Sequence, residues 1–190
     1  MINDALLLDF LYKYYENDYG KKKLVSVLKE DKNISLRSID WFITNYSKKN
    51  NIFYLIYTNK DGEPTFDEKN NNFQTNLNVY HSYKSQLKAY SKRRFDPFCR
   101  RDRLYFNYDG DKKLETTIGQ LNFFKWAISN LVIDYILKHK KEIEDDMNLC
   151  LKTSKKGTHK SGTRKRRQEL SLSATRGLNL NKVPIQLDFD

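Results

Sequence analysis

The chain of 190 residues has little cysteine, glycine or proline, with 2, 7 and 3 residues of each. Two cysteines, Cys99 and Cys150, are too few for a disulfide framework, so we expect free thiols in a reducing compartment. The glycines are not clustered into a phosphate-binding loop, and no GxSxG nucleophile elbow is present. These absences argue against a nucleotide-binding enzyme or a serine hydrolase, and we expect no cofactor.

Long apolar runs are also missing. The longest one, 123–137, is interrupted by Lys125, Asn130 and Asp134, so no membrane-spanning helix is predicted. The first residues carry an early acid and no basic segment, unlike a secretory signal. We therefore expect a soluble protein of the nucleus or cytoplasm with no membrane partner.

Patterns for metal binding and catalysis are weak. The three histidines lie far apart and neither cysteine belongs to a CxxC pair, so zinc-binding spacing is absent. Glu63, Asp67 and Lys69 resemble the acid, acid-x-Lys pattern of metal-dependent nucleases, but such short patterns arise by chance in charged loops. We assign no catalytic and no metal-binding residue, and keep a nuclease as the last alternative.

Positive charge is what the chain has in abundance, with a formal net charge of +11. A polyanion is the natural partner of such a surface, because each neutralised phosphate releases a counterion. The tail bases also fit a nuclear localisation signal, an anionic protein or membrane contact, or a merely solvated tail. Eight bases and no acid lie in this tail segment: Lys152, Lys155, Lys156, Lys160, Arg164, Lys165, Arg166 and Arg167.

A second basic cluster falls on a predicted helix, 77–93, and its continuation. Helical spacing puts its lysines on one stripe and Tyr80, Tyr83 and Tyr90 on another, which suits a duplex groove or a single-strand track. The rings either stack on bases or, more commonly at this spacing, pack in the core, and the bases can be a solvated face. The cluster comprises Lys84, Lys88, Lys92, Arg93, Arg94, Arg100, Arg101 and Arg103, against Asp96 and Asp102.

Hydrophobic patterning predicts an α+β body over residues 1–150, with a helical N-terminal part and two short β-hairpins. Helix–helix–helix–hairpin over 1–66 also fits a winged-helix-like subdomain, with a generic α+β arrangement as the alternative. The expected helices cover 4–15, 22–30 after a break at Gly20, and a segment capped by Ser35; the expected hairpins cover 53–58 with its turn at 59–62, and 104–108 with 114–117.

A central helix is predicted over 118–137, where apolar side chains occupy two nearly opposite faces. Thr117 and Gln120 fit a capping box at its start, and Ser129–Asn130 is a candidate break. The two faces indicate a helix buried in the core, with a protein-partner interface as the alternative. Residues 151–182 should form a disordered basic tail, and Val183–Asp190, which alternates apolar and polar residues, could add a strand to the body or to a protein partner.

Three stretches resemble a family of uncharacterised proteins from nucleocytoplasmic large DNA viruses of algae and protists. The stretches are SLRSIDWFITNY at 35–46, YKSQLKAYSK with FDPFCRR within 83–101, and ETTIGQLNFFKWA at 115–127. The resemblance spans roughly residues 35–140 and implies a viral protein made in a host cell, packaged in the virion or acting on viral DNA. It assigns no activity and no site residue.

The function predicted from these features is non-enzymatic nucleic-acid binding, largely independent of sequence, with DNA favoured over RNA. A structural or interaction protein, such as a minor virion component, is the alternative.

Overall fold

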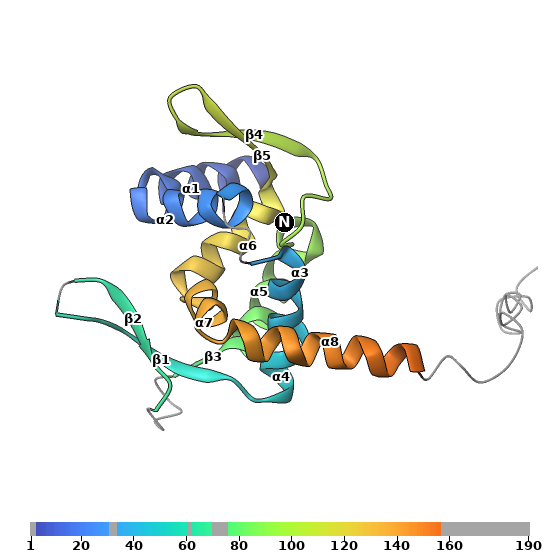
Figure 1. The fold of residues 1–190 in the computed structure, drawn as a ribbon. Helices are drawn as coiled ribbons and strands as arrows, with labels where there is room; N and C mark the ends of the chain where they lie inside the picture. Colours follow the sequence, from blue (N-terminus) through green and yellow to red (C-terminus); the bar gives the residue numbers. More distant parts are fainter. Residues whose placement is uncertain (1–2, 31–33, 61, 70–75, 157–190) are drawn as a thin grey trace, which may run out of the picture. The chain divides into compact units, whose positions relative to one another are not determined.

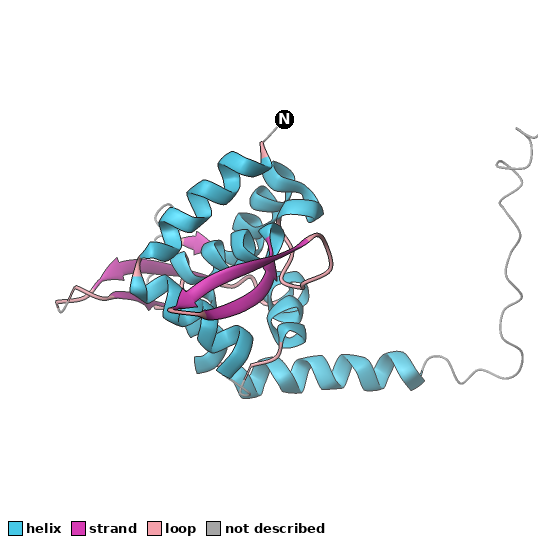
Figure 2. Ribbon diagram, turned by 90° about the horizontal axis from the view of Figure 1, so that it is seen from above, coloured by secondary structure: helices cyan, strands magenta, loops and turns pink. Residues whose placement is uncertain are grey.

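The computed structural model describes residues 3–30, 34–60, 62–69 and 76–156. Residues 1–152 form one compact unit. Figure 1 gives the order of the elements along the chain and Figure 2 their type. The elements are α1 Asp4–Glu16, α2 Asp18–Val25, the π-helix η1 Ser26–Glu30, α3 Leu36–Trp41, the π-helix η2 Phe42–Tyr46, α4 Ser47–Lys49, β1 Phe53–Thr58, β2 Pro64–Asp67, β3 Leu77–Asn78, α5 Val79–Arg94, β4 Arg103–Asp109, β5 Lys112–Thr117, α6 Ile118–Ser129, α7 Val132–Lys138 and α8 Lys140–Lys156.

The fold is α+β, as predicted, with two small antiparallel sheets. Both expected hairpins are present: β1 pairs with β2, and β4 with β5. Gly62 and Gly110 turn them with φ of 81° and 51°, a conformation that glycine adopts without a Cβ penalty. A strand missed in the sequence, β3, pairs with the other edge of β1 and gives the order β2-β1-β3.

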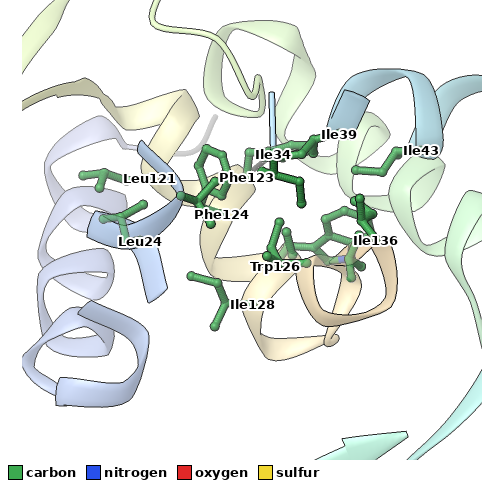
Figure 3. Close-up of a cluster of buried hydrophobic side chains, with 14 of the residues drawn as sticks. Leu24, Ile34, Ile39, Ile43, Leu121, Phe123, Phe124, Trp126, Ile128 and Ile136 are labelled. Carbon is green, nitrogen blue, oxygen red and sulfur yellow. The ribbon is translucent and has the colours of Figure 1, made fainter. Parts of the chain in front are cut away.

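Helix α6 is the centre of the core. Nine of its residues are buried, from Gly119 to Ile128, because α1 and α2 pack against it and α5 packs against it as well. Figure 3 shows Leu24 of α2 beside Leu121 of α6. The two apolar faces therefore belong to the core, as predicted, and leave no apolar face of α6 for a protein partner.

The predicted central helix is broken at the expected position, Ser129–Asn130. α6 ends at Ser129, and Leu131 takes a left-handed φ of 52° before α7 begins. A non-glycine residue in this region is strained. Burial holds it there, because the Leu131 side chain is only 2% exposed.

Two predicted helix caps are present. One of them, the capping box at Thr117, forms only one of its two hydrogen bonds. The Ser35 side chain accepts a hydrogen bond from the backbone N–H of Ser38 at 2.9 Å, which starts α3. Thr117 Oγ1 accepts from the N–H of Gln120 at 3.1 Å, which starts α6. The Gln120 amide does not cap back as a capping box requires; it donates to the carbonyl of Pro97 instead.

The prediction of a helix break at Gly20 is wrong. The break falls at Asn17, whose side chain accepts from the N–H of Tyr19 and caps α2. Gly20 lies buried inside α2, where a Cβ would come within 3.0 Å of the Tyr14 ring. Glycine at this position therefore allows α1 and α2 to pack closely. The sequence prediction failed because glycine more often marks the end of a helix.

The winged-helix-like subdomain over residues 1–66 stays a prediction. α1 and α2 lie against each other and against α6, whereas η2 and α4 lie against α5; Figure 1 shows where α1, α2 and α4 lie. The first two helices and the η2–α4 segment therefore pack on different helices of the core.

The predicted tail begins later than expected, because α8 continues to Lys156. The rest of the tail, 157–182, and the peptide Val183–Asp190 lie outside the described residues. Within the described part of the chain, no helix combines the length and apolar character that crossing a membrane requires.

Candidate nucleic-acid interface

Helix α5 carries five of the eight bases of the predicted cluster, and Arg100, Arg101 and Arg103 follow it in the chain. Asn78 caps its start by accepting a hydrogen bond from the N–H of His81 at 3.0 Å. Its other side packs on α6, η2 and α4. The predicted single stripe of lysines is interrupted, because Ser91 takes φ 59° and ψ 168° inside the helix. Lys84 and Lys88 stay on one regular stripe, and Lys92 lies beyond the kink.

Lys84 and Lys88 are both exposed, and neither makes an ion pair with another described residue. No acid of the described residues lies within 4.0 Å of either ammonium group. The two side chains line a shallow hollow of about 510 Å³ together with His81, Ser85 and Leu87. Successive lysines on this stripe are about 6 Å apart along the helix axis, from the rise of about 1.5 Å per residue.

Lys48 of α4 extends this surface, and sequence reasoning missed it. Its Nζ lies 5.5 Å from the ring centroid of Tyr80, in the first turn of α5. Lys48 is exposed, and it too has no ion pair among the residues that the structure describes. We call Lys48, Lys84 and Lys88 the α5 ridge. Lys48 can be found only once α4 is known to pack beside α5.

Four arginines of the predicted cluster are paired with acids of the same chain, and their role in binding stays a prediction. Arg100 makes a bidentate contact with Asp96, at 3.1 Å from Nε and 3.0 Å from Nη2. The others are Arg93 with Asp102 at 3.8 Å, Arg94 with Asp4, and Arg103 with Glu115. Each of these four arginines therefore has a carboxylate beside it, unlike Lys84 and Lys88 among the described residues.

Lys92 and Arg101 complete the cluster. Both are exposed and neither makes an ion pair within the described ranges. Burial raises the pKa of the Asp40 carboxyl, and the nearby Asp96 raises it further, while Arg100 and Lys92 act in the opposite direction. Asp40 is therefore an acid close enough to Lys92 and Arg100 to sense their charge.

The tyrosines of α5 pack mainly inward, in agreement with the core interpretation. Tyr83 lies 5.9 Å from Phe95 and 6.2 Å from Trp126 between ring centroids. Tyr90 stacks on Phe95 at 6.4 Å. Both belong to the margin of the hydrophobic core.

Most of the predicted tail bases lie outside the described residues. Lys155 and Lys156 lie in the last turn of α8. Arg164, Lys165, Arg166 and Arg167 lie outside the described residues.

The residues of the nuclease alternative do not converge. Asp67 Oδ1 accepts a hydrogen bond from the backbone N–H of Lys69 at 2.9 Å, as in a turn. Glu63 is exposed and lies four residues earlier, about 13 Å along an extended chain. Two carboxylates that far apart cannot share one cation at the usual ligand distance of about 2.5 Å. Among the described residues, no group of three His, Cys, Asp or Glu is placed to hold a metal ion.

An acid–base cluster that the sequence did not indicate joins β2 to the α7–α8 junction. Lys138 donates to Glu68 at 2.6 Å, and His139 Nε2 lies 3.0 Å from the same carboxylate. His139 also stacks on Tyr135 at 4.5 Å and has Glu142 at 3.6 Å on its other nitrogen. The partners of His139 come from separate segments, so this residue links those segments to each other.

Comparison with known proteins places the chain among viral proteins without assigned activity. A family model described as a family of unknown function, DUF7197, matches residues 4–161. An uncharacterized protein, L507, of Acanthamoeba polyphaga mimivirus is 34% identical over 238 aligned residues, which cover 97% of this chain and 87% of that protein. No solved structure matches. The resemblance to an uncharacterised family of large DNA viruses is thus confirmed, and it extends well beyond 35–140.

Proposed function

The chain belongs to the DUF7197 family of unknown function, and from that premise we propose that it is a non-enzymatic protein that binds nucleic acid through the phosphates. One observation carries the proposal: Lys84 and Lys88 stand side by side on α5, exposed and with no ion-pair partner among the described residues. Nucleic acid holds condensed cations along its phosphates, and each lysine that neutralises a phosphate releases such a counterion, whose gain in entropy favours binding.

The chemistry of these contacts favours binding without sequence preference. Ammonium groups are point charges that contact phosphate oxygens, which position a protein on a duplex without reading bases. The bases at Lys155, Lys156 and 164–167 add further phosphate contacts, or serve as a nuclear localisation signal. We propose DNA rather than RNA, and action in the infected host cell or in the virion, because the relative is encoded by a large DNA virus.

Fluorescence anisotropy of the full chain with a labelled duplex tests this function. The variant Lys84→Ala with Lys88→Ala removes two ridge charges. The control, Lys13→Ala with Lys141→Ala, removes the same charge from α1, where Lys13 pairs with Asp9 at 3.3 Å, and from α8. We expect the ridge variant to bind the duplex roughly tenfold or more weakly than the wild type at about 0.1 M salt. The reason is that each lost phosphate contact lowers the slope of log K against log salt by about 0.9. Equal affinity of both variants would contradict the proposal.

A structural or interaction role is the second candidate, and an exposed apolar face favours it. Leu6 and Phe10 of α1 are 69% and 51% exposed and lie four residues apart, on one side of the helix. Apolar side chains of this size on a surface mark many protein contacts. If they form one, Leu6→Ser with Phe10→Ser will lower the mass of any assembly measured by light scattering. An unchanged mass would remove this candidate.

A further inference from the structure

The α5 ridge differs from a single-strand track in what accompanies its charge. Proteins that bind single strands combine a basic groove with aromatic faces on which successive bases stack, worth about 1–3 kcal/mol per base. The tyrosines of α5 are the rings closest in sequence to Lys84 and Lys88. Their orientation therefore decides which form of nucleic acid the ridge can hold.

Two of the three tyrosine rings, those of Tyr83 and Tyr90, pack against aromatic side chains of the core. Tyr83 contacts both Phe95 and Trp126, and Tyr90 stacks on Phe95 with an interplanar angle of 19°. Phe95 itself is only 2% exposed. A base could reach these faces only by displacing core contacts.

The third ring, Tyr80, is covered by its neighbours. The Lys48 ammonium group lies 5.5 Å from its centroid, and the His81 ring meets it at 5.8 Å and 68°. This cation–π contact places a ridge charge over the ring. Stacking a base there would require Lys48 to leave the ring, so charge and stacking compete at this position.

Rings that are exposed lie on other elements. Tyr57 of β1 is 46% exposed and Tyr105 of β4 is 66% exposed. Neither lies on α4 or α5, the two helices that carry the ridge. Among the described residues, the ridge thus offers phosphate contacts with no exposed tyrosine, phenylalanine or tryptophan beside them, and the one exposed ring at its hollow is the imidazole of His81.

We infer that the α5 ridge binds the backbone of double-stranded nucleic acid and not a single strand. The inference rests on the proposed function and names its substrate. In a duplex the bases are stacked within the ligand, so a surface with charge and no free tyrosine ring loses nothing, whereas a single strand would gain only the weaker phosphate term.

The test compares a labelled duplex with its isolated single strand, both titrated with the full chain by fluorescence anisotropy at one salt concentration. Each ligand is measured with the wild type, with Lys84→Ala and Lys88→Ala together, and with Tyr80→Ala. We expect the lysine variant to lose roughly tenfold or more on the duplex and clearly less on the single strand. Tyr80→Ala should change single-strand affinity by less than about twofold.

The outcomes separate the two claims. If neither ligand binds, or the lysine variant binds both as the wild type does, the proposed function itself fails. If the lysine variant loses more on the single strand, or Tyr80→Ala weakens single-strand binding tenfold, nucleic-acid binding stands and the assignment to a duplex is overturned. Circular dichroism of each variant, matching that of the wild type, shows that the differences arise from the surface and not from unfolding.

Discussion

The side-chain amide of Gln120 donates a hydrogen bond of 2.9 Å to the backbone carbonyl of Pro97. Its other atom, Oε1, accepts from Thr116 Oγ1 at 2.8 Å, and the whole residue is only 2% exposed. One buried amide therefore ties the start of α6 both to β5 and to the segment between α5 and β4. That segment carries Arg100 and Arg101, so their placement depends on this contact.

Replacing Gln120 by methionine keeps the volume and removes both hydrogen bonds. Two buried polar groups are then left without these partners, at about 1–3 kcal/mol each. We expect a loss of about 2–6 kcal/mol in the free energy of unfolding, measured by chemical denaturation. Gln86→Met on α5 is the control, since Gln86 makes no side-chain hydrogen bond among the described residues; equal losses in both variants would contradict this account.

Two glycines make a matched pair for close packing. A Cβ on Gly119 would meet backbone, with Arg93 O at 3.0 Å and Phe95 N at 3.4 Å, whereas a Cβ on Gly20 would meet the Tyr14 ring at 3.0 Å. Backbone cannot yield as a side chain can, so Gly119→Ala should destabilise by about 1–3 kcal/mol. Gly20→Ala should stay within about 1 kcal/mol of the wild type, because alanine gains up to about 1 kcal/mol in helix propensity. Thermal unfolding of both variants checks this, and the reverse order would refute it.

The Glu68 contacts predict a defined loss of stability in acid. Burial alone would raise the pKa of the Glu68 carboxyl, but hydrogen bonds and charge from Lys138 and His139 outweigh it and hold the pKa below its ordinary value of 4.5. A lowered pKa in the folded state means that the stabilisation is complete above pH 4.5 and disappears as the pH falls through the folded-state pKa.

The matching variant is Glu68→Gln, which cannot titrate. It should melt below the wild type at pH 7, and the gap between the two melting temperatures should shrink as the pH is lowered from about 5 to 3. Melting curves followed by circular dichroism measure the gap. A gap that widens on acidification would show that Glu68 is not stabilised in its charged form.

The tail makes a separate prediction. Alanine at 164–167 removes four bases, and if all four contact phosphate the slope of log K against log salt should fall by about 3.6, from about 0.9 per contact. An unchanged slope, with loss of nuclear accumulation of a fluorescent fusion, would assign these residues to localisation alone.

Features that depend on local sequence were predictable. Ser35 and Thr117 cap their helices within three residues, and Gly62 and Gly110 turn hairpins of neighbouring strands. These signals lie within a few residues of the structure they specify, because caps and tight turns are local hydrogen-bond problems.

The charges of the site were not predictable in the same way. The partner of Arg94 is Asp4, at a separation of 90 residues, and Arg103 meets Glu115 only through the register of β4 and β5. The kink at Ser91 also has no signal in the sequence. Ion pairs of this kind depend on how distant segments pack. The sequence alone therefore could not tell which of the eight bases have an acid beside them, or that Lys48 lies beside α5, the helix of Lys84 and Lys88.

The salt dependence of duplex binding tests the central claim most directly. Titrating the full chain across a salt series gives the slope of log K against log salt, for the wild type and for Lys84→Ala with Lys88→Ala. The account predicts a slope smaller by about 1.8 in the variant, from about 0.9 per phosphate contact. Identical slopes would mean that neither lysine touches phosphate, and would contradict it.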